Sequence, residues 1–137
     1  MRVLHVTSEC APWAKSGGLG DVVGALPDAL ARTSDEVETA TVMPYYRKAK
    51  QSVAKRGLTP TDTGIVADVN LGASTARVRF LRLDRPGRTP VFFATNDAAF
   101  DRDGLYGFDD DALRFILLSK ATVGVAKRLL SDRKSVV

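Results

Sequence analysis

The stretch Lys15-Ser16-Gly17-Gly18-Leu19-Gly20-Asp21-Val22 follows the apolar run Arg2–Thr7, and these two segments together decide the fold. The apolar run is short, rich in β-branched residues and followed by polar residues and a proline, so it predicts a buried strand. Beyond the glycines, apolar residues recur at helical spacing. A strand, a glycine loop and a helix in this order are typical of an open α/β sheet. In such sheets the loop lies at the carboxyl end of the strand, where ligands bind.

The helix after the loop is expected to pack against the sheet through an apolar face made of Leu19, Val22, Val23, Leu26 and Leu30. Asp28 and Arg32 fall on the opposite side, which we expect to face solvent. Pro27 lies within the pattern and predicts a bend, because it removes a backbone donor and its ring crowds the preceding turn.

The glycine loop combines groups that suit a phosphate. Glycine lets the backbone take positive φ or approach a ligand closely, and the first N–H groups of the helix point at the same place. Lys15 adds a cation and Asp21 a carboxylate. Taken singly, each feature has a plainer interpretation: a loop turn, a solvated cation and a stabilising carboxylate at a helix start. Neither the P-loop sequence nor the dinucleotide fingerprint is present in this loop.

A longer pattern contains the loop, S-E-x-x-P-x-x-K-[ST]-G-G-L-G-D-V followed by a leucine-proline pair, and residues 8–27 match it at every fixed position. This segment resembles the amino-terminal signature of bacterial glycogen synthases and plant starch synthases. Two later segments agree with the family in order and spacing: Met43–Arg47 is similar to its P-x-Y segment, and Phe100–Gly107 to its F-D-R-x-G-L-Y-G loop. The resemblance covers residues 1 to about 130.

The resemblance implies an α/β, Rossmann-like open sheet that forms the amino-terminal portion of a GT-B glycosyltransferase. Such enzymes transfer glucose from ADP-glucose to the non-reducing end of an α-1,4-glucan with retention of configuration. By position, the resemblance assigns substrate binding to Lys15, Gly17 and Gly18, and a catalytic role to Asp21. It implies neither a metal nor a cofactor, since ADP-glucose is a substrate. We expect Glu9 to brace the loop rather than to catalyse.

A GT-B enzyme needs two domains, and 137 residues are too few for both. We therefore expect residues 1–131 to be part of an amino-terminal catalytic domain, inactive without the missing carboxyl-terminal domain, and residues 132–137 to be a non-native tail. UDP-glucose stays possible as the donor, because base recognition belongs largely to the other half. Two alternatives stay open: another sugar-nucleotide GT-B transferase, and a non-catalytic glycan- or nucleotide-binding module.

Composition excludes several classes of function. No apolar stretch approaches the ~20 residues that cross a bilayer, and no export signal is visible, so we expect no membrane partner. The only cysteine, Cys10, cannot form an intramolecular disulfide, which favours the cytoplasm. The net charge of +4 is modest, and the arginines at 77–88 are not interleaved with aromatic residues, so we expect no nucleic-acid partner. Alternation over residues 76–83 instead favours an edge strand.

The rest of the chain predicts a strand at 36–43, a polar excursion at 47–63, a hairpin from 65–71 and 75–83, a short strand at 91–94 and a long helix from about 109. His5, the only histidine, fits a core or edge position better than a general base. Trp13, Tyr45 and Tyr46 could stack on sugar rings, although packing explains such aromatics at least as well.

Overall fold

The computed structural model of this protein describes residues 1–132. Its strands are β1 (Arg2–Val6), β2 (Glu38–Pro44), β3 (Thr61–Asn70), β4 (Thr75–Leu83) and β5 (Val91–Thr95). Its helices are α1 (Gly18–Thr33), α2 (Arg47–Lys55), α3 (Asp97–Phe100) and α4 (Asp111–Leu130). The tail expected at 132–137 lies, from residue 133 on, outside the described residues.

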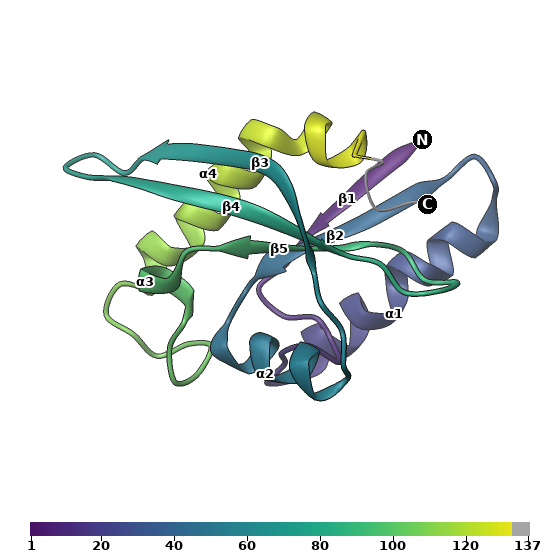
Figure 1. Cartoon of the computed structure of the whole chain (residues 1–137), viewed down its shortest axis with the longest axis horizontal. Coiled ribbons are helices and arrows are strands. Elements are labelled where there is room, and N and C mark those ends of the chain that lie inside the picture. Colours follow the sequence, from purple (N-terminus) through teal and green to yellow (C-terminus); the bar gives the residue numbers. More distant parts are fainter. Residues whose placement is uncertain (133–137) are drawn as a thin grey trace.

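The strands form one open sheet in the order β1-β2-β5-β4-β3. β1, β2 and β5 are parallel, whereas β4 runs antiparallel to β5, and β3 to β4. Figure 1 shows α1 and α2 on one side of the sheet and α4 on the other. The expected α/β open sheet is therefore confirmed, with the glycine loop at the carboxyl end of β1.

β3 and β4 form the predicted hairpin, although β3 begins at Thr61, earlier than expected. The prediction of β4 as an edge strand is wrong, because β4 lies between β5 and β3. Its alternation was interpreted correctly: Val78 and Phe80 are fully buried, and Arg77 and Arg79 are exposed. β5 supplies the second neighbour, and its pairing with β4 depends on contacts that local alternation does not encode.

The core lies on both faces of the central strands β2 and β5. Val42, Met43, Phe92 and Phe93 are completely buried, as expected for parallel strands covered by helices on both sides. Each such side chain contributes about 1.5–3 kcal/mol relative to an exposed one. This packed centre holds the strand ends, and the loops that follow them, in fixed positions.

The buried face of α1 is rotated from the predicted one and only partly overlaps it: Val23 packs against the core and Arg32 is exposed, as expected. Leu19, Val22 and Leu26 are 52%, 58% and 41% exposed, whereas Asp28 is buried. The Asp28 carboxylate accepts hydrogen bonds from the backbone N–H of Thr89 (2.8 Å) and its hydroxyl (2.7 Å), and it also pairs with Arg88. These partners are on the turn between β4 and β5, so the sequence around Asp28 gives no sign of them.

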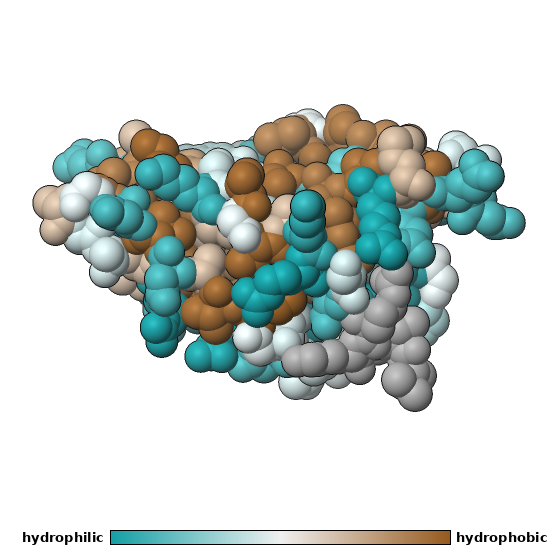
Figure 2. Space-filling view, turned by 90° about the horizontal axis from the view of Figure 1, so that it is seen from above, coloured by the Kyte–Doolittle hydropathy of each residue, from teal (hydrophilic) through white to brown (hydrophobic). Residues whose placement is uncertain are grey.

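The two longer helices after β2 differ in how well the sequence indicated them. α2, in the region expected to be a polar excursion, buries only Ala49 and Val53, so its apolar stripe is too short to recognise. α4 follows the predicted helix, and its buried face is made of Arg114, Leu117, Leu118, Ala121, Thr122, Val125 and Leu129. Leu113 and Ile116, two apolar residues of the same helix, are exposed. Apolar side chains are visible across the side of the molecule shown in Figure 2.

Within residues 1–132, no helix combines the length and the apolar character needed to span a bilayer.

Candidate functional site

The candidate site is built by the loops that follow the three parallel strands. Residues 7–17 follow β1, residues 45 and 46 follow β2, and residues 96–110 follow β5. The Tyr46 hydroxyl donates to the carbonyl of Ser8 at 2.8 Å, and the Tyr106 and Ser8 hydroxyls lie 2.7 Å apart. The three motif segments recognised in the sequence therefore meet at one edge of the sheet, as Figure 1 lets the reader follow.

Glu9 is the centre of this junction. Its side chain is buried and accepts hydrogen bonds from the Ser16 backbone N–H (2.8 Å), the Ser16 hydroxyl (2.9 Å), the Gly17 N–H (3.2 Å) and the Tyr106 hydroxyl (2.6 Å). The expected bracing role of Glu9 is thus confirmed by geometry. One carboxylate fixes the residues just before α1 and ties them to a loop almost a hundred residues later.

Charge at Glu9 is stabilised in spite of its burial. Burial raises the pKa of this carboxyl, but hydrogen bonds from Tyr106, Ser16 and Gly17 outweigh that effect and lower the pKa from 4.5 to about 2. Burial, together with the hydrogen bond to Glu9, raises the pKa of Tyr106 to about 12. At neutral pH the junction therefore joins an ionised carboxylate to a protonated phenol.

Gly17 and Gly18 have no packing reason to be glycine. A Cβ added to either would meet no heavy atom within 4 Å, and neither has positive φ. Gly17 has φ −168° and ψ −156°, an extended conformation open to other residues. The space beside these two residues is empty of protein atoms from the described chain. The backbone is therefore bare on the side where a ligand could approach it closely.

Gly20 and Gly24 are different, because they contact the protein itself. A Cβ on Gly20 would lie 2.4 Å from the Lys15 Cβ, and one on Gly24 would lie 2.8 Å from the Ala11 carbonyl oxygen. The N–H of Ala11 also donates to the Gly20 carbonyl at 2.9 Å. Gly20, expected to serve a ligand or to take positive φ, instead lets the loop lie against α1. This close approach explains why α1 turns its glycine face inward.

Lys15 and Asp21 form an ion pair across the start of α1. The Lys15 Nζ lies 2.8 Å from the Asp21 Oδ1, and about half of each side chain is exposed. The first N–H groups of a helix have no intrahelical acceptor, and no side chain caps those of α1. The structure thus brings all four predicted residues, Lys15, Gly17, Gly18 and Asp21, to one accessible end of a helix with a positive dipole.

The aromatic residues near the site mainly serve packing. Trp13 and Tyr46 are 1% and 0% exposed, so neither offers a face to a sugar. Tyr45 is half-buried: its ring packs on Phe93, and the Lys50 ammonium lies 5.7 Å from the ring centroid. His5 is partly buried within β1, and burial lowers its pKa, consistent with the expected core or edge position.

Arg114 is a positioning residue that the sequence analysis missed. Only 2% exposed, it donates to the carbonyls of Ala99 (2.6 Å) and Leu105 (2.9 Å) and to the Asp111 carboxylate (2.8 Å). These bonds shape the loop that carries Tyr106 to Glu9. An arginine within the apolar stripe of a helix was the available signal, because a charge is buried only when it is paired.

No group of three or more histidine, cysteine, aspartate or glutamate side chains within residues 1–132 could hold a metal ion. The chemistry that the site offers comes instead from one ammonium group, exposed main-chain N–H groups and two carboxylates.

Comparison with known proteins places this geometry in a family. A family model described as the starch synthase catalytic domain matches residues 2–137. Glycogen synthase of Moorella thermoacetica is 40% identical over 125 residues, which cover 91% of this chain and 24% of that protein. Glycogen synthase of Bacillus subtilis is 36% identical over 129 residues, covering 93% of this chain and 25% of that protein.

A solved structure supports the same family. The catalytic domain of starch synthase IV from Arabidopsis thaliana, bound to ADP and acarbose, is similar with a TM-score of 0.61 and 26% identity. The alignment covers 96% of this chain and 26% of that one. The chain spans about a quarter of the length of the relatives that it matches. The expected fold, the amino-terminal portion of a GT-B glycosyltransferase, is confirmed, and the chain belongs to the starch synthase catalytic domain family.

Proposed function

We propose that this chain is part of a glycogen or starch synthase, which transfers glucose from ADP-glucose to the non-reducing end of an α-1,4-glucan with retention. The named relatives and the ADP-bound neighbour support this proposal. The described residues contribute one wall of the donor site. Turnover requires the opposite wall, from a carboxyl-terminal domain, because catalysis depends on holding the donor between fixed groups.

One observation carries the proposal. Gly17 and Gly18 are glycine without any steric demand from the described protein, and they lie beside a cation and the uncapped start of α1. Bare backbone next to a positive helix end suits a diphosphate and the sugar attached to it. Gly20 and Gly24, by contrast, are adjacent to protein atoms that leave no room for a Cβ.

The hydrogen bonds to Glu9 indicate which main-chain N–H groups are free to bind the sugar nucleotide. The N–H groups of Ser16 and Gly17 already donate to Glu9, so they serve the loop rather than the ligand. The next N–H groups, those of Gly18 and Leu19, open α1 and are the ones that we assign to the diphosphate. Glu9 acts as a positioning residue, because it fixes the loop from which these groups extend.

Charge development gives Lys15 its role. The bond between glucose C1 and the diphosphate oxygen breaks while a bond to the acceptor hydroxyl oxygen forms. The leaving diphosphate gains negative charge and takes up the proton that the hydroxyl loses. An ammonium fixed beside it stabilises the transition state more than the ground state. The Asp21 carboxylate lies 2.8 Å from the Lys15 Nζ, and we propose that it holds that ammonium in place. The resemblance implied a catalytic role for Asp21, and in this proposal Asp21 acts through Lys15.

The proposal includes the partners. ADP-glucose and the glucan are substrates, and neither a cofactor nor a metal is required. Neither a nucleic acid nor a membrane is a proposed partner. We place the enzyme in the cytoplasm, where its single buried thiol would stay reduced.

A glucan-elongation assay tests the function in a full-length enzyme that contains this chain. ADP-glucose and UDP-glucose are supplied in parallel, and the anomeric configuration of the new linkage is read by NMR. Elongation from ADP-glucose with α-linked product supports the proposal. Transfer to a different acceptor would favour another GT-B transferase, and saturable donor binding without any transfer would favour a binding module. The 137-residue chain, assayed alongside, is expected to give no turnover.

A further inference from the structure

Arg85, on the turn between β4 and β5, has a buried hydrogen-bond donor that no residue within 1–132 uses. It is only partly exposed, and its Nε is fully buried without a hydrogen-bond partner in the described chain. Its guanidinium carbon lies 4.9 Å from the centroid of the Trp13 ring. No carboxylate within residues 1–132 forms an ion pair with Arg85, whereas most of the other partly buried arginines do. A planar guanidinium with free donors is suited to bind an oxyanion.

The charges around Arg85 are mainly of the same sign. Arg88, three residues later, and Arg56, after α2, both lower its pKa, although burial is the larger cause. Arg56 lies over the same tryptophan ring, 5.7 Å from its centroid, and bonds only to Ser52. Three carboxylates are near, and each is already paired: Asp28 with Arg88, Asp84 with Arg82, and Glu38 with Arg2. Positive charge therefore exceeds negative charge at this turn, which is unfavourable unless an anion joins it.

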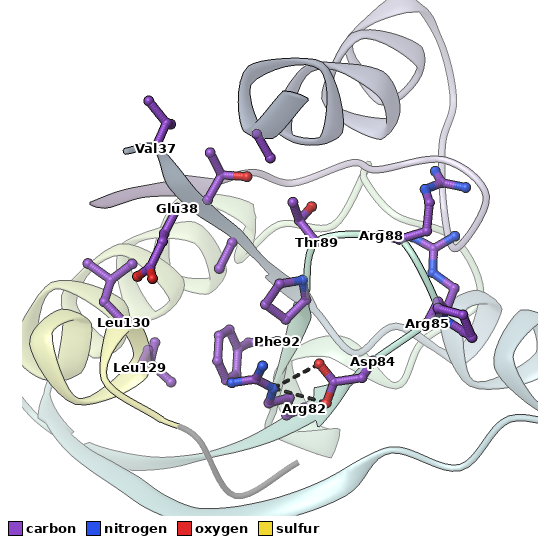
Figure 3. A pocket seen from close by; sticks show the side chains of 15 residues that line it. Val37, Glu38, Arg82, Asp84, Arg85, Arg88, Thr89, Phe92, Leu129 and Leu130 are labelled. Carbon is purple, nitrogen blue, oxygen red and sulfur yellow. Dashed lines mark hydrogen bonds and ion pairs between the residues drawn. The ribbon is translucent and has the colours of Figure 1, made fainter. Parts of the chain in front are cut away.

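A cavity adjoins these arginines. It measures about 730 Å³ and lies where β2 and β5 begin, at the other edge of the sheet from the glycine loop. Arg85 and Arg88 line one end, and apolar residues such as Phe92 and Leu129 form much of the remaining wall. Glu38 and the Arg82–Asp84 ion pair line the cavity as well. In Figure 3, the side chains of Arg85 and Arg88 extend together, away from the Arg82–Asp84 pair. A cavity of this size whose wall combines apolar residues with a few charged groups is typical of small-molecule sites.

We propose that this cavity binds a small molecule with a phosphate group, whose oxygens accept hydrogen bonds from Arg85 and Arg88 while its apolar part occupies the space beside Phe92. The site is separate from the proposed donor site and does not depend on the proposed function. Trp13 connects the two, because it lies in the loop that leads directly to Lys15.

The chain itself carries the probe. Trp13 is the only tryptophan, and it lies under Arg85, so a bound anion should change its fluorescence. The full 137-residue chain is titrated with inorganic phosphate and with phenyl phosphate, at an ionic strength held constant with chloride. We expect saturable changes in emission and a rise in melting temperature with both, and tighter binding of phenyl phosphate because its ring enters the apolar cavity.

Three variants make the result specific. Arg85→Gln should weaken binding at least about tenfold, because it removes the free donors. Arg56→Gln, at an exposed position that tolerates change, should weaken it less. Arg128→Gln makes the same charge change on the exposed part of α4 and should leave binding unaltered. The proposal is overturned if phosphate produces no saturable response, if chloride produces an equal one, or if Arg85→Gln binds like the wild type.

Discussion

Two pairs of glycines lie within eight residues of each other at the start of α1, and their surroundings differ completely. Gly17 and Gly18 face open space, whereas Gly20 and Gly24 are pressed against Lys15 and Ala11. One motif therefore contains glycines of two kinds. Packing within the described protein explains the second kind and not the first, which is the kind that we propose to face the donor. The difference separates the residues proposed to act on a ligand from those that shape the loop.

The largest effect on turnover is expected at Lys15, which is among the residues proposed to bind the donor. Lys15→Ala in the full-length enzyme should lower kcat/KM by about 10²–10³-fold, the usual result of losing one group that stabilises transition-state charge. The melting temperature should barely change, because the ion pair with Asp21 is about half exposed and such pairs contribute little. Steady-state kinetics and a thermal melt measure both. If Lys15→Ala and Asp21→Ala both retained full turnover, the assignment of the site would be wrong.

Glu9 links the two kinds of glycine and should show the largest effect on stability. Its pKa in the folded protein, about 2, lies below the ordinary 4.5, so its contribution is fully present above about pH 4.5 and is lost as pH falls toward 2. Full loss corresponds to about 3 kcal/mol. Glu9→Gln should remove this pH dependence, which denaturant unfolding between pH 2 and 7 measures. Glu36→Gln, at an exposed position, is the matched control and should keep the wild-type profile.

Alanine substitutions test the glycine comparison directly. Gly24→Ala should destabilise the fold by about 1–3 kcal/mol, because its Cβ would meet a backbone carbonyl that cannot yield easily. Gly17→Ala should leave the unfolding free energy within about 0.5 kcal/mol of wild type, since its Cβ meets nothing. In the full-length enzyme, Gly17→Ala should nevertheless reduce turnover. Equal destabilisation by both substitutions would remove the distinction on which the site rests.

Among the substitutions expected to destabilise the fold, the smallest effect is expected at the hydroxyl of Tyr106. Tyr106→Phe removes the hydrogen bonds to Glu9 and Ser8 and should cost about 1 kcal/mol, because the ring is 40% exposed and water partly replaces them. The pKa of Glu9 should rise in this variant, since the hydrogen bond from Tyr106 lowers that pKa more than any other hydrogen bond does. NMR titration of the Glu9 carboxyl measures this rise. An unchanged Glu9 pKa would show that the two loops are not coupled there.

The sequence predicted the elements better than their arrangement. Local patterns predict all five strands and the helices α1 and α4. The motif predicted that Lys15, Gly17, Gly18 and Asp21 lie close together, and they do. Their functional roles stay predictions. α2 was missed because two buried residues do not make a recognisable stripe.

The errors share a physical cause, which is contact between distant segments. The buried face of α1 is set by a loop and by Arg88 and Thr89, sixty residues away from Asp28. The place of β4 inside the sheet is set by β5. Glu9 was expected to brace the loop, but its bond to Tyr106 and the role of Arg114 depend on the folded chain. Local periodicity cannot encode such partners.

The distance in sequence between Glu9 and Tyr106 has a consequence for biosynthesis. Ser16 and Gly17 can reach the carboxylate as soon as they are made, whereas the phenol arrives 97 residues later. A nascent chain emerging from the ribosome therefore holds an incomplete set of hydrogen bonds around Glu9 until residue 106 has left the exit tunnel. Long-range contacts of this kind form slowly.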